Sequence, residues 1–161
     1  MLAAMNKTGA FVIYNRSNLN GGVVQNRAIS NGGGSGKFIG MPAFDPTTNA
    51  VYVGNPEDSV DATYLHGLIA LQANASCQLS LLWQQTFGDN GRSNPAVPPT
   101  IANGVLWFAE GLLDQLLAFD DANGTLLRSS GQLKGSTTGA PIVVNGQVFI
   151  QAGEWVYAFG L

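Results

Sequence analysis

Short apolar runs recur along the chain, separated by turns rich in Asn, Gly, Pro and Asp. Four of them can be aligned on Ile13, Ala70, Ala118 and Ala158, at separations of 57, 48 and 40 residues. The runs are about five residues long and consist mainly of aliphatic and aromatic side chains, which favours buried β-strands. No window of about 12 residues or more has a helical period. The pattern predicts an all-β protein built from a repeated unit.

Each unit is predicted to hold up to four antiparallel strands. A second apolar strand precedes every aligned run, a further strand precedes the last three of these pairs, and an outer strand follows the first three runs. Asn103-Gly104 and Asn145-Gly146 predict two-residue hairpin turns, because both residue types tolerate positive φ. Four-stranded units of about 40 to 50 residues in series are typical of β-propeller blades.

The repeats also resemble a known family. The segments "HGLIALQANASCQLSLLWQQ", "NGVLWFAEGLLDQLLAFDDANGTLL" and "APIVVNGQVFIQAGEWVYAFGL" are similar to the repeats of pyrroloquinoline-quinone-like β-propeller proteins. One departure from the family pattern is in the outer strands: one of them ends with Trp83, whereas the next has Arg128 at the same place. The resemblance covers nearly the whole chain and implies a propeller fold. It leaves the function open, because the family includes dehydrogenases, assembly scaffolds and proteins of unknown role.

The strand count gives about half of the eight-bladed ring that the resemblance implies. The N-terminal unit lacks its innermost strand and the C-terminal unit its outermost, which gives 3, 4, 4 and 3 strands. We expect a single partial propeller over residues 1–161, with blade segments near 1–30, 38–88, 95–131 and 136–161. Its bare ends would expose large apolar side chains, each worth about 1.5–3 kcal/mol when buried. We therefore expect a homodimer that completes the ring; the rival interpretation is the C-terminal part of a longer propeller.

Composition narrows the possible partners. Only 11% of the residues are charged, the net charge is −3, and Lys and Arg form no cluster, which argues against nucleic acid and anionic membrane surfaces. No run of about 18 apolar residues could span a membrane. Asn6, Lys7 and Thr8 interrupt the apolar N-terminal stretch, so the chain as written has no secretory signal and is expected in the cytoplasm. Members of the resembling family are often periplasmic or extracellular.

The segment Asn31-Gly-Gly-Gly-Ser-Gly-Lys37 looks like a phosphate-binding loop but departs from that motif. Asn31 replaces its first Gly, and Phe38 stands where a Ser or Thr would bind magnesium. Pro42 makes a following helix improbable. We interpret this segment as a connection between blades.

Two further groups of residues are candidate sites. His66 is the only histidine, and no Ser lies in a G-x-S-x-G motif that could pair with it. We interpret His66 as a loop or strand-edge residue with a satisfied hydrogen bond. Asn55, Glu57, Asp58 and Asp61 offer oxygen ligands in one loop, but their spacing lacks the regular calcium-loop pattern. This loop is interpreted as solvated.

The remaining candidates are interpreted structurally. Trp83 and Trp107 lie within strands and are expected to pack between blades, and Trp155 begins a strand and could do the same. Asp114 and Glu154 lie where a connection turns toward the third strand and are expected at the surface.

The preferred interpretation is a non-catalytic propeller module that binds a protein or small-molecule ligand on a loop face or acts structurally. No residue is assigned a catalytic, cofactor-binding or metal-binding role. The alternative is a fragment or relative of a quinone-dependent dehydrogenase. The resemblance implies pyrroloquinoline quinone and calcium for that alternative alone. Such dehydrogenases often have a disulfide between adjacent cysteines beside the quinone, which Cys77, the single cysteine, cannot supply.

Overall fold

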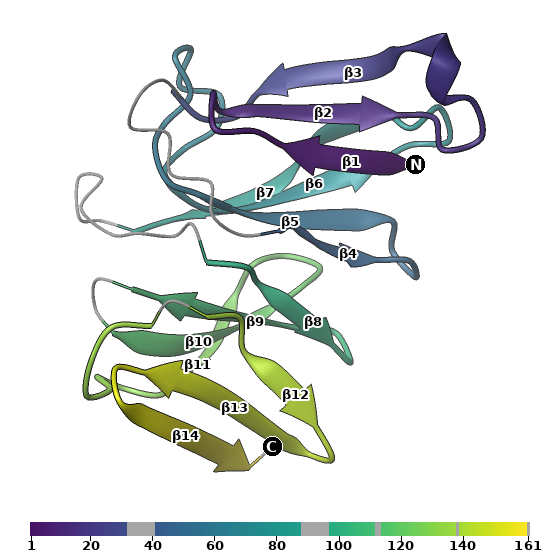
Figure 1. Ribbon diagram of the computed structural model, residues 1–161. Helices are drawn as coiled ribbons and strands as arrows, with labels where there is room; N and C mark the ends of the chain where they lie inside the picture. Colours follow the sequence, from purple (N-terminus) through teal and green to yellow (C-terminus); the bar gives the residue numbers. More distant parts are fainter. Residues whose placement is uncertain (32–40, 88–96, 112–113, 138, 161) are drawn as a thin grey trace.

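The chain folds into four antiparallel β-sheets that follow one another in series from the N-terminus to the C-terminus (Figure 1). A computed structural model describes residues 1–31, 41–87, 97–111, 114–137 and 139–160. Within these residues the regular elements are fourteen strands and one 3-10 turn, η1, at Leu19–Gly21. The predicted all-β architecture, without α-helices, is confirmed.

Sheets 1 and 2 form the N-terminal half of the molecule. Sheet 1 has the order β1-β2-β3, and sheet 2 has the order β4-β5-β6-β7. Their strands are β1 (Leu2–Met5), β2 (Ala10–Tyr14), β3 (Val23–Ala28), β4 (Ala43–Asp45), β5 (Ala50–Asn55), β6 (Gly67–Ala73) and β7 (Leu79–Thr86).

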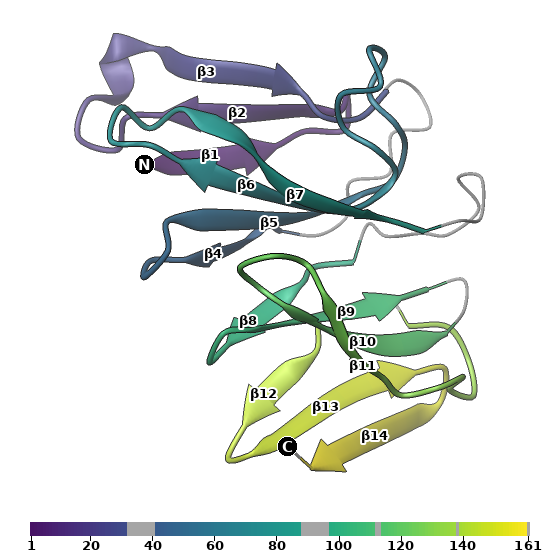
Figure 2. The ribbon, with the colours of Figure 1, turned by 180° about the vertical axis from the view of Figure 1, so that it is seen from behind.

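Sheets 3 and 4 form the C-terminal half, seen from behind in Figure 2. Sheet 3 has the order β8-β9-β10-β11, and sheet 4 has the order β12-β13-β14. Their strands are β8 (Thr100–Ala102), β9 (Val105–Glu110), β10 (Gln115–Asp120), β11 (Leu126–Ser129), β12 (Ile142–Val144), β13 (Gln147–Ala152) and β14 (Trp155–Gly160).

The strand pairing shows which residues of the four sheets are equivalent. The aligned residues Ile13, Ala70, Ala118 and Ala158 pair with Ala3, Tyr52, Trp107 and Phe149, respectively. In sheets 1, 2 and 3 the register with the outer strand shifts directly after the aligned residue. Because a bulge at the same position increases the twist in the same way, the three sheets share one shape. β1 therefore corresponds to β5, β9 and β13, and not to the innermost strands β4, β8 and β12.

The predicted Asn-Gly hairpins are present. Asn103 and Gly104 have φ of 52° and 77°, and Asn145 and Gly146 have φ of 50° and 73°. Two consecutive positive φ values fit the tight turn whose twist matches that of the flanking strands. The turns therefore fix the register of β8 with β9 and of β12 with β13.

Hydrophobic cores fill the spaces between consecutive sheets. Phe11 and Ile13 of sheet 1 pack with Val51 and Ile69 of sheet 2. The next core joins sheets 2 and 3, and the last joins sheets 3 and 4. Trp83 packs against the second core and Trp107 against the third, which confirms their expected place between blades. Both faces of a middle sheet are buried, and this explains the near-continuous apolar runs of β5 and β6.

One surface prediction is wrong. Asp114 is half-buried, and its Oδ1 atom is buried with no hydrogen-bond partner among the residues that the structure describes. Its carbonyl oxygen accepts a hydrogen bond of 2.7 Å from the backbone N–H of Leu133, so the segment after β11 folds back beside it. Glu154 is exposed, as predicted.

Candidate functional site

The two end sheets each present one apolar face that no described residue covers. In sheet 1, Ala3 and Met5 pack toward sheet 2, so the alternating residues Leu2 and Ala4 face away from it. Val12 and Tyr14 alternate with Phe11 and Ile13 in the same way. We define the N-terminal flank as Leu2, Ala4, Val12 and Tyr14.

The opposite end of the molecule has a matching face. Val143 and Val148 pack toward sheet 3, as do Tyr157 and Phe159. Their neighbours along the strands therefore face outward. We define the C-terminal flank as Ile142, Phe149, Val156 and Ala158.

Residues at the same strand positions in the middle sheets form the core between sheets 2 and 3. The N-terminal flank corresponds to Leu106, Phe108, Leu117 and Phe119 of sheet 3. Of the C-terminal flank, Phe149, Val156 and Ala158 correspond to Tyr52, Leu68 and Ala70 of sheet 2. Leu106 and Leu68 are 0% exposed, whereas their equivalents Leu2 and Val156 are 48% and 74% exposed. The N-terminal flank thus corresponds to one side of the core between sheets 2 and 3, and the C-terminal flank to the other. Neither flank has an opposing sheet among the described residues.

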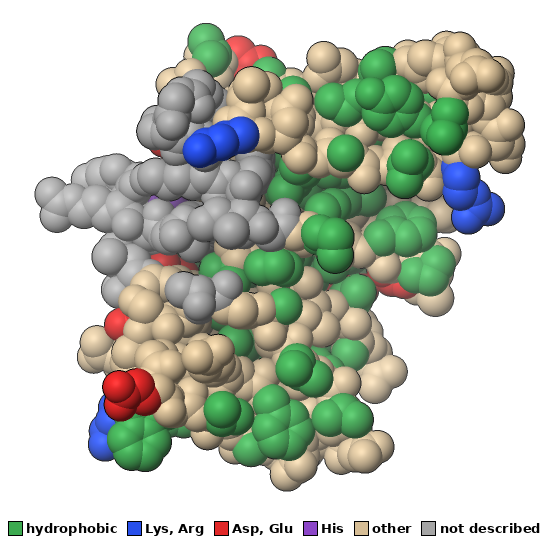
Figure 3. Space-filling model, in the orientation of Figure 1, with side chains coloured by type: hydrophobic (Ala, Val, Ile, Leu, Met, Phe, Trp, Pro, Cys, Tyr) green, Lys and Arg blue, Asp and Glu red, His purple; other side chains and the backbone are tan. Residues whose placement is uncertain are grey.

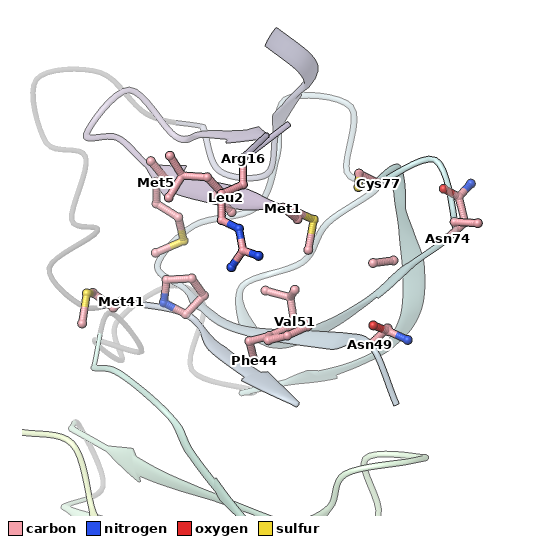
Figure 4. A pocket seen from close by; sticks show the side chains of 15 residues that line it. Met1, Leu2, Met5, Arg16, Met41, Phe44, Asn49, Val51, Asn74 and Cys77 are labelled. Carbon is pink, nitrogen blue, oxygen red and sulfur yellow. The ribbon is translucent and has the colours of Figure 1, made fainter. Parts of the chain in front are cut away.

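A cavity of about 960 Å³ lies between β1 and sheet 2 (Figure 4). Its walls come from four segments of the chain: the start of the chain, the turn after β2, the strands β4 and β5 with the residues beside them, and the turn after β6. Most of the labelled lining side chains are apolar, and the sulfur-containing ones include Met1, Met5, Met41 and Cys77. Hydrophobic side chains also gather around β1 and β4 in the space-filling view (Figure 3).

The cavity lies where no strand of the described residues pairs with the inner edge of β1, and beside Ala3, whose side chain is small. The equivalents of Ala3 are Tyr52, Trp107 and Phe149, whose rings are far larger. The effect shows at Phe44 of β4, which lines the cavity and is 46% exposed. Its equivalent Ile101 in β8 is half-buried, since β4 contacts β8. Phe44 has no corresponding strand in front of it among the described residues.

Among the described residues of the cavity wall, Arg16 supplies the only charged side chain. Its guanidinium group points into the cavity (Figure 4). It forms no ion pair or hydrogen bond with any residue that the structure describes. Arg16 is therefore the group of the described wall that would attract an anionic side chain.

A smaller cavity, of about 280 Å³, lies at the other end of the chain. Trp107 and Phe159 line it, together with Arg128 of β11. It lies beside β14, where sheets 2 and 3 have an outer strand and sheet 4 has none among the described residues. Both cavities therefore lie where an end sheet has one strand fewer among the described residues than the middle sheets have.

The acidic loop and His66 are held by internal hydrogen bonds. Asp58 Oδ1 accepts a 2.6 Å bond from the backbone N–H of His66, which is buried directly before β6. Asp61 Oδ1 accepts bonds from the hydroxyl of Ser59 and the N–H of Thr63. These bonds, led by that of Ser59, lower the pKa of Asp61 to about 2. Asp58 and Asp61 therefore stabilise the fold of this loop.

The described residues offer no cradle for the calcium of a quinone site. No group of three or more His, Cys, Asp or Glu side chains among them could hold a metal ion. Of the phosphate-loop-like segment, residues 32–37 lie outside the described part of the chain.

A polar cluster crosses the core between sheets 2 and 3. Trp83 Nε1 donates a 2.8 Å hydrogen bond to the carbonyl of Asp121, and the Tyr52 hydroxyl donates a 3.2 Å bond to the same oxygen. Burial, and then the charge of Asp121, raises the pKa of Tyr52 to about 12. Burial, with the nearby charges of Asp45 and Asp120, raises the pKa of Asp121. The cluster aligns the two sheets.

Within the described residues no helix has the length and apolarity needed to cross a membrane.

Comparison with known proteins adds the fold type. No family model matches the chain, and no curated protein matches its sequence. BamB from Moraxella catarrhalis aligns with 98% of this chain, at 14% identity and a TM-score of 0.65. The computationally designed Ika4 protein aligns with 99% of it, at 16% identity and a TM-score of 0.64. A europium-containing methanol dehydrogenase aligns with 58% of it, at 23% identity; its TM-score of 0.46 carries no argument.

The chain spans only part of two of these structures. It covers 41% of BamB and 19% of the methanol dehydrogenase, but 84% of Ika4. A solved chain only slightly longer than this one thus has the same arrangement of strands. With four sheets in series and these likenesses, the fold is that of the β-propeller proteins.

Proposed function

We propose that the chain is a non-catalytic half-propeller of the pyrroloquinoline-quinone-like type, which pairs with a second copy of itself to close a ring. The N-terminal flank of each copy packs on the C-terminal flank of the other. The observation that carries the proposal is the equivalence of both flanks to the two halves of the core between sheets 2 and 3. The contact between copies would then repeat a contact that the chain already makes within itself.

Burial favours this pairing. Each large apolar side chain that leaves water contributes about 1.5–3 kcal/mol. Two identical contacts form in one two-fold pair, so the loss of translational and rotational freedom occurs once while burial is gained twice. The eight residues of the two flanks carry no charge, so no desolvated ion opposes the contact.

The ring would act as a structural or binding module. Its polar, mostly uncharged loops would form two broad faces on which a protein or small ligand can bind. The alternative function, that of a quinone-dependent dehydrogenase, is tested by incubating the chain with pyrroloquinoline quinone and calcium. A bound chromophore together with reduction of a dye would show catalysis and would exclude the non-catalytic role.

The pairing predicts a complementation experiment with two variants. Val12→Asp blocks the N-terminal flank and Val156→Asp blocks the C-terminal flank, so light scattering should find each variant monomeric. A mixture retains one compatible contact, between the free N-terminal flank of one variant and the free C-terminal flank of the other. The mixture should therefore contain two-chain particles at higher protein concentration.

Val60→Asp is the matched control, since Val60 is 84% exposed in the loop between β5 and β6. It should leave the particle mass unchanged. If Val12→Asp or Val156→Asp alone remains dimeric, the flanks do not pair as proposed.

A further inference from the structure

The cavity beside β1 has a feature that the pairing of two copies does not use. β1 is the last strand in the order of sheet 1, and no strand of the described residues pairs with its other edge. Such an edge presents unpaired backbone donors and acceptors to an incoming strand. In sheets 2, 3 and 4 the same edge of the equivalent strand is paired with β4, β8 and β12.

We propose that this edge is a docking site for an extended peptide segment of a partner protein. The segment adds antiparallel to β1, as β4 adds to β5. In sheet 2, Ala43, Phe44 and Asp45 pair with Tyr52, Val51 and Ala50. The equivalent residues of sheet 1 are Ala3, Leu2 and Met1. Three consecutive residues of the incoming peptide, which we call the guest, therefore pair with these.

The lining of the cavity specifies the guest. The guest residues opposite Ala3 and Met1 face sheet 2, because paired residues lie on the same side of a sheet. The first of them meets the exposed ring of Phe44, which favours an apolar side chain. The second lies at the end of the cavity that Met1 and Arg16 line. An acidic side chain there finds the guanidinium group of Arg16, which the described residues leave unpaired.

The backbone edge favours a peptide over a small apolar molecule. An apolar ligand would fill the volume but leave the donors and acceptors of β1 unpaired. A strand satisfies them and covers Phe44 in the way that β4 contributes to covering Ile101. The site lies within one chain, between sheets 1 and 2, so it does not depend on the closed ring.

Cys77 reports on occupancy, since it lines the cavity and is the only cysteine. The probe is the blocked peptide Pro-Ala-Phe-Asp-Pro-Thr, which copies residues 42–47. We expect it to slow the alkylation of Cys77 by iodoacetamide in a saturable manner. N-methylation of its Phe removes one backbone donor, and N-methylation of its Ala removes another. At least one of these two changes should weaken binding about fivefold.

A charge swap tests the guest chemistry. Arg16→Glu should weaken binding of the peptide about fivefold, and a peptide with Lys in place of Asp should bind the variant better than it binds the natural chain. Arg128→Gln removes an arginine elsewhere and should have no effect. Fusing the eight residues Pro-Ala-Phe-Asp-Pro-Thr-Thr-Asn ahead of Met1 should occupy the edge from within the chain and abolish binding of the free peptide.

Ala3→Phe separates the two kinds of ligand. Large rings coexist with an innermost strand at this position in sheets 2, 3 and 4, so the variant should still bind the peptide. A small apolar ligand would lose its space. The proposal is overturned if the peptide fails to protect Cys77, or if laurate protects it and Ala3→Phe abolishes that protection. Equal binding of the natural and both N-methylated peptides would also exclude strand addition.

Discussion

The core between sheets 2 and 3 and the two flanks use the same strand positions with opposite results. Leu106, Phe108, Leu117 and Phe119 are buried, whereas their equivalents in sheet 1 lie on an uncovered face. The side chains are of the same kind, apart from Ala4 in place of Phe108. The difference lies in the neighbouring sheet, which the chain itself supplies in one case only.

This comparison shows that an apolar strand face becomes a core or an interface according to which element lies against it. A propeller sheet has two faces to cover, and a sheet at the end of a series can cover only one. The proposed pairing of two copies would give each end sheet the second cover that it lacks among the described residues. Substitutions at equivalent positions measure how much more a side chain contributes to stability between two middle sheets than on the open face of an end sheet.

The largest effect is expected in the middle core. Phe108→Ala removes a ring that is 0% exposed and stacks on Phe87 at 5.7 Å between ring centroids. It should lower the free energy of unfolding by about 3–5 kcal/mol, measured by urea denaturation. Val12→Ala, on the N-terminal flank, should lower the free energy of unfolding of the single chain by less. Its effect should appear as weaker association of two copies. A loss below about 1 kcal/mol for Phe108→Ala would contradict the assignment of this core.

Two glycines with the same backbone conformation isolate the packing between sheets. Gly124 and Gly146 both have φ of 73°, and a Cβ at Gly124 would lie 2.6 Å from Trp83, whereas a Cβ at Gly146 would meet nothing within 4 Å. Gly146→Ala should cost about 1–2 kcal/mol for the backbone alone. Gly124→Ala should cost about 1–3 kcal/mol more, because Trp83 must move. Thermal unfolding of the pair measures the difference, and equal losses would show that Trp83 does not hold the sheets together.

A smaller effect is expected at the hydrogen bond of Trp83. Trp83→Phe keeps an aromatic ring but leaves the Asp121 carbonyl without the 2.8 Å bond from Nε1. The loss should be about 1 kcal/mol. Trp155→Phe is the control, because Trp155 is 56% exposed, with Lys134 over its ring, and should change stability by less than about 0.5 kcal/mol. Similar losses in both variants would argue against a specific role for Trp83.

The smallest effect concerns pH. The raised pKa of Asp121 means that, above the unfolded value near 3.8, the folded state holds its proton more tightly than the unfolded chain. Stability therefore falls as the pH rises from that value through the folded pKa. Asp45 acts in the opposite direction: hydrogen bonds led by Thr47 lower its pKa, and its contribution is lost on acidification.

Asp121→Asn should remove the fall in stability and make the chain more stable than the natural one above the folded pKa of Asp121. Urea unfolding measured across that range, in steps of pH, gives the two slopes. If Asp121→Asn leaves the slope of stability against pH unchanged, burial does not raise the pKa of Asp121 in the folded chain.

Much of the fold could be predicted from the sequence. The runs aligned on Ala70 and Ala118, the strand order and the Asn-Gly turns depend on local preferences that the chain displays directly. The register shift after Ile13, Ala70 and Ala118 could not be predicted, because it depends on the outer strand. The half-burial of Asp114 could not be predicted either, because a later segment folds back beside it.

The cavity could not be predicted from the sequence either. Met1, Arg16, Phe44 and Cys77 are distant along the chain and meet only when sheets 1 and 2 stack. The signal that existed was indirect. Ala3 stands where the other units have an aromatic residue, and this becomes visible only once the pairing register aligns it with Tyr52.

Closure of the proposed ring requires the two flanks to pack together as one inter-sheet contact between copies. Sedimentation equilibrium of the natural chain at micromolar concentration measures whether they do. We expect a particle of twice the 16.8 kDa chain mass. A stable 16.8 kDa monomer with both apolar flanks exposed to water would contradict it.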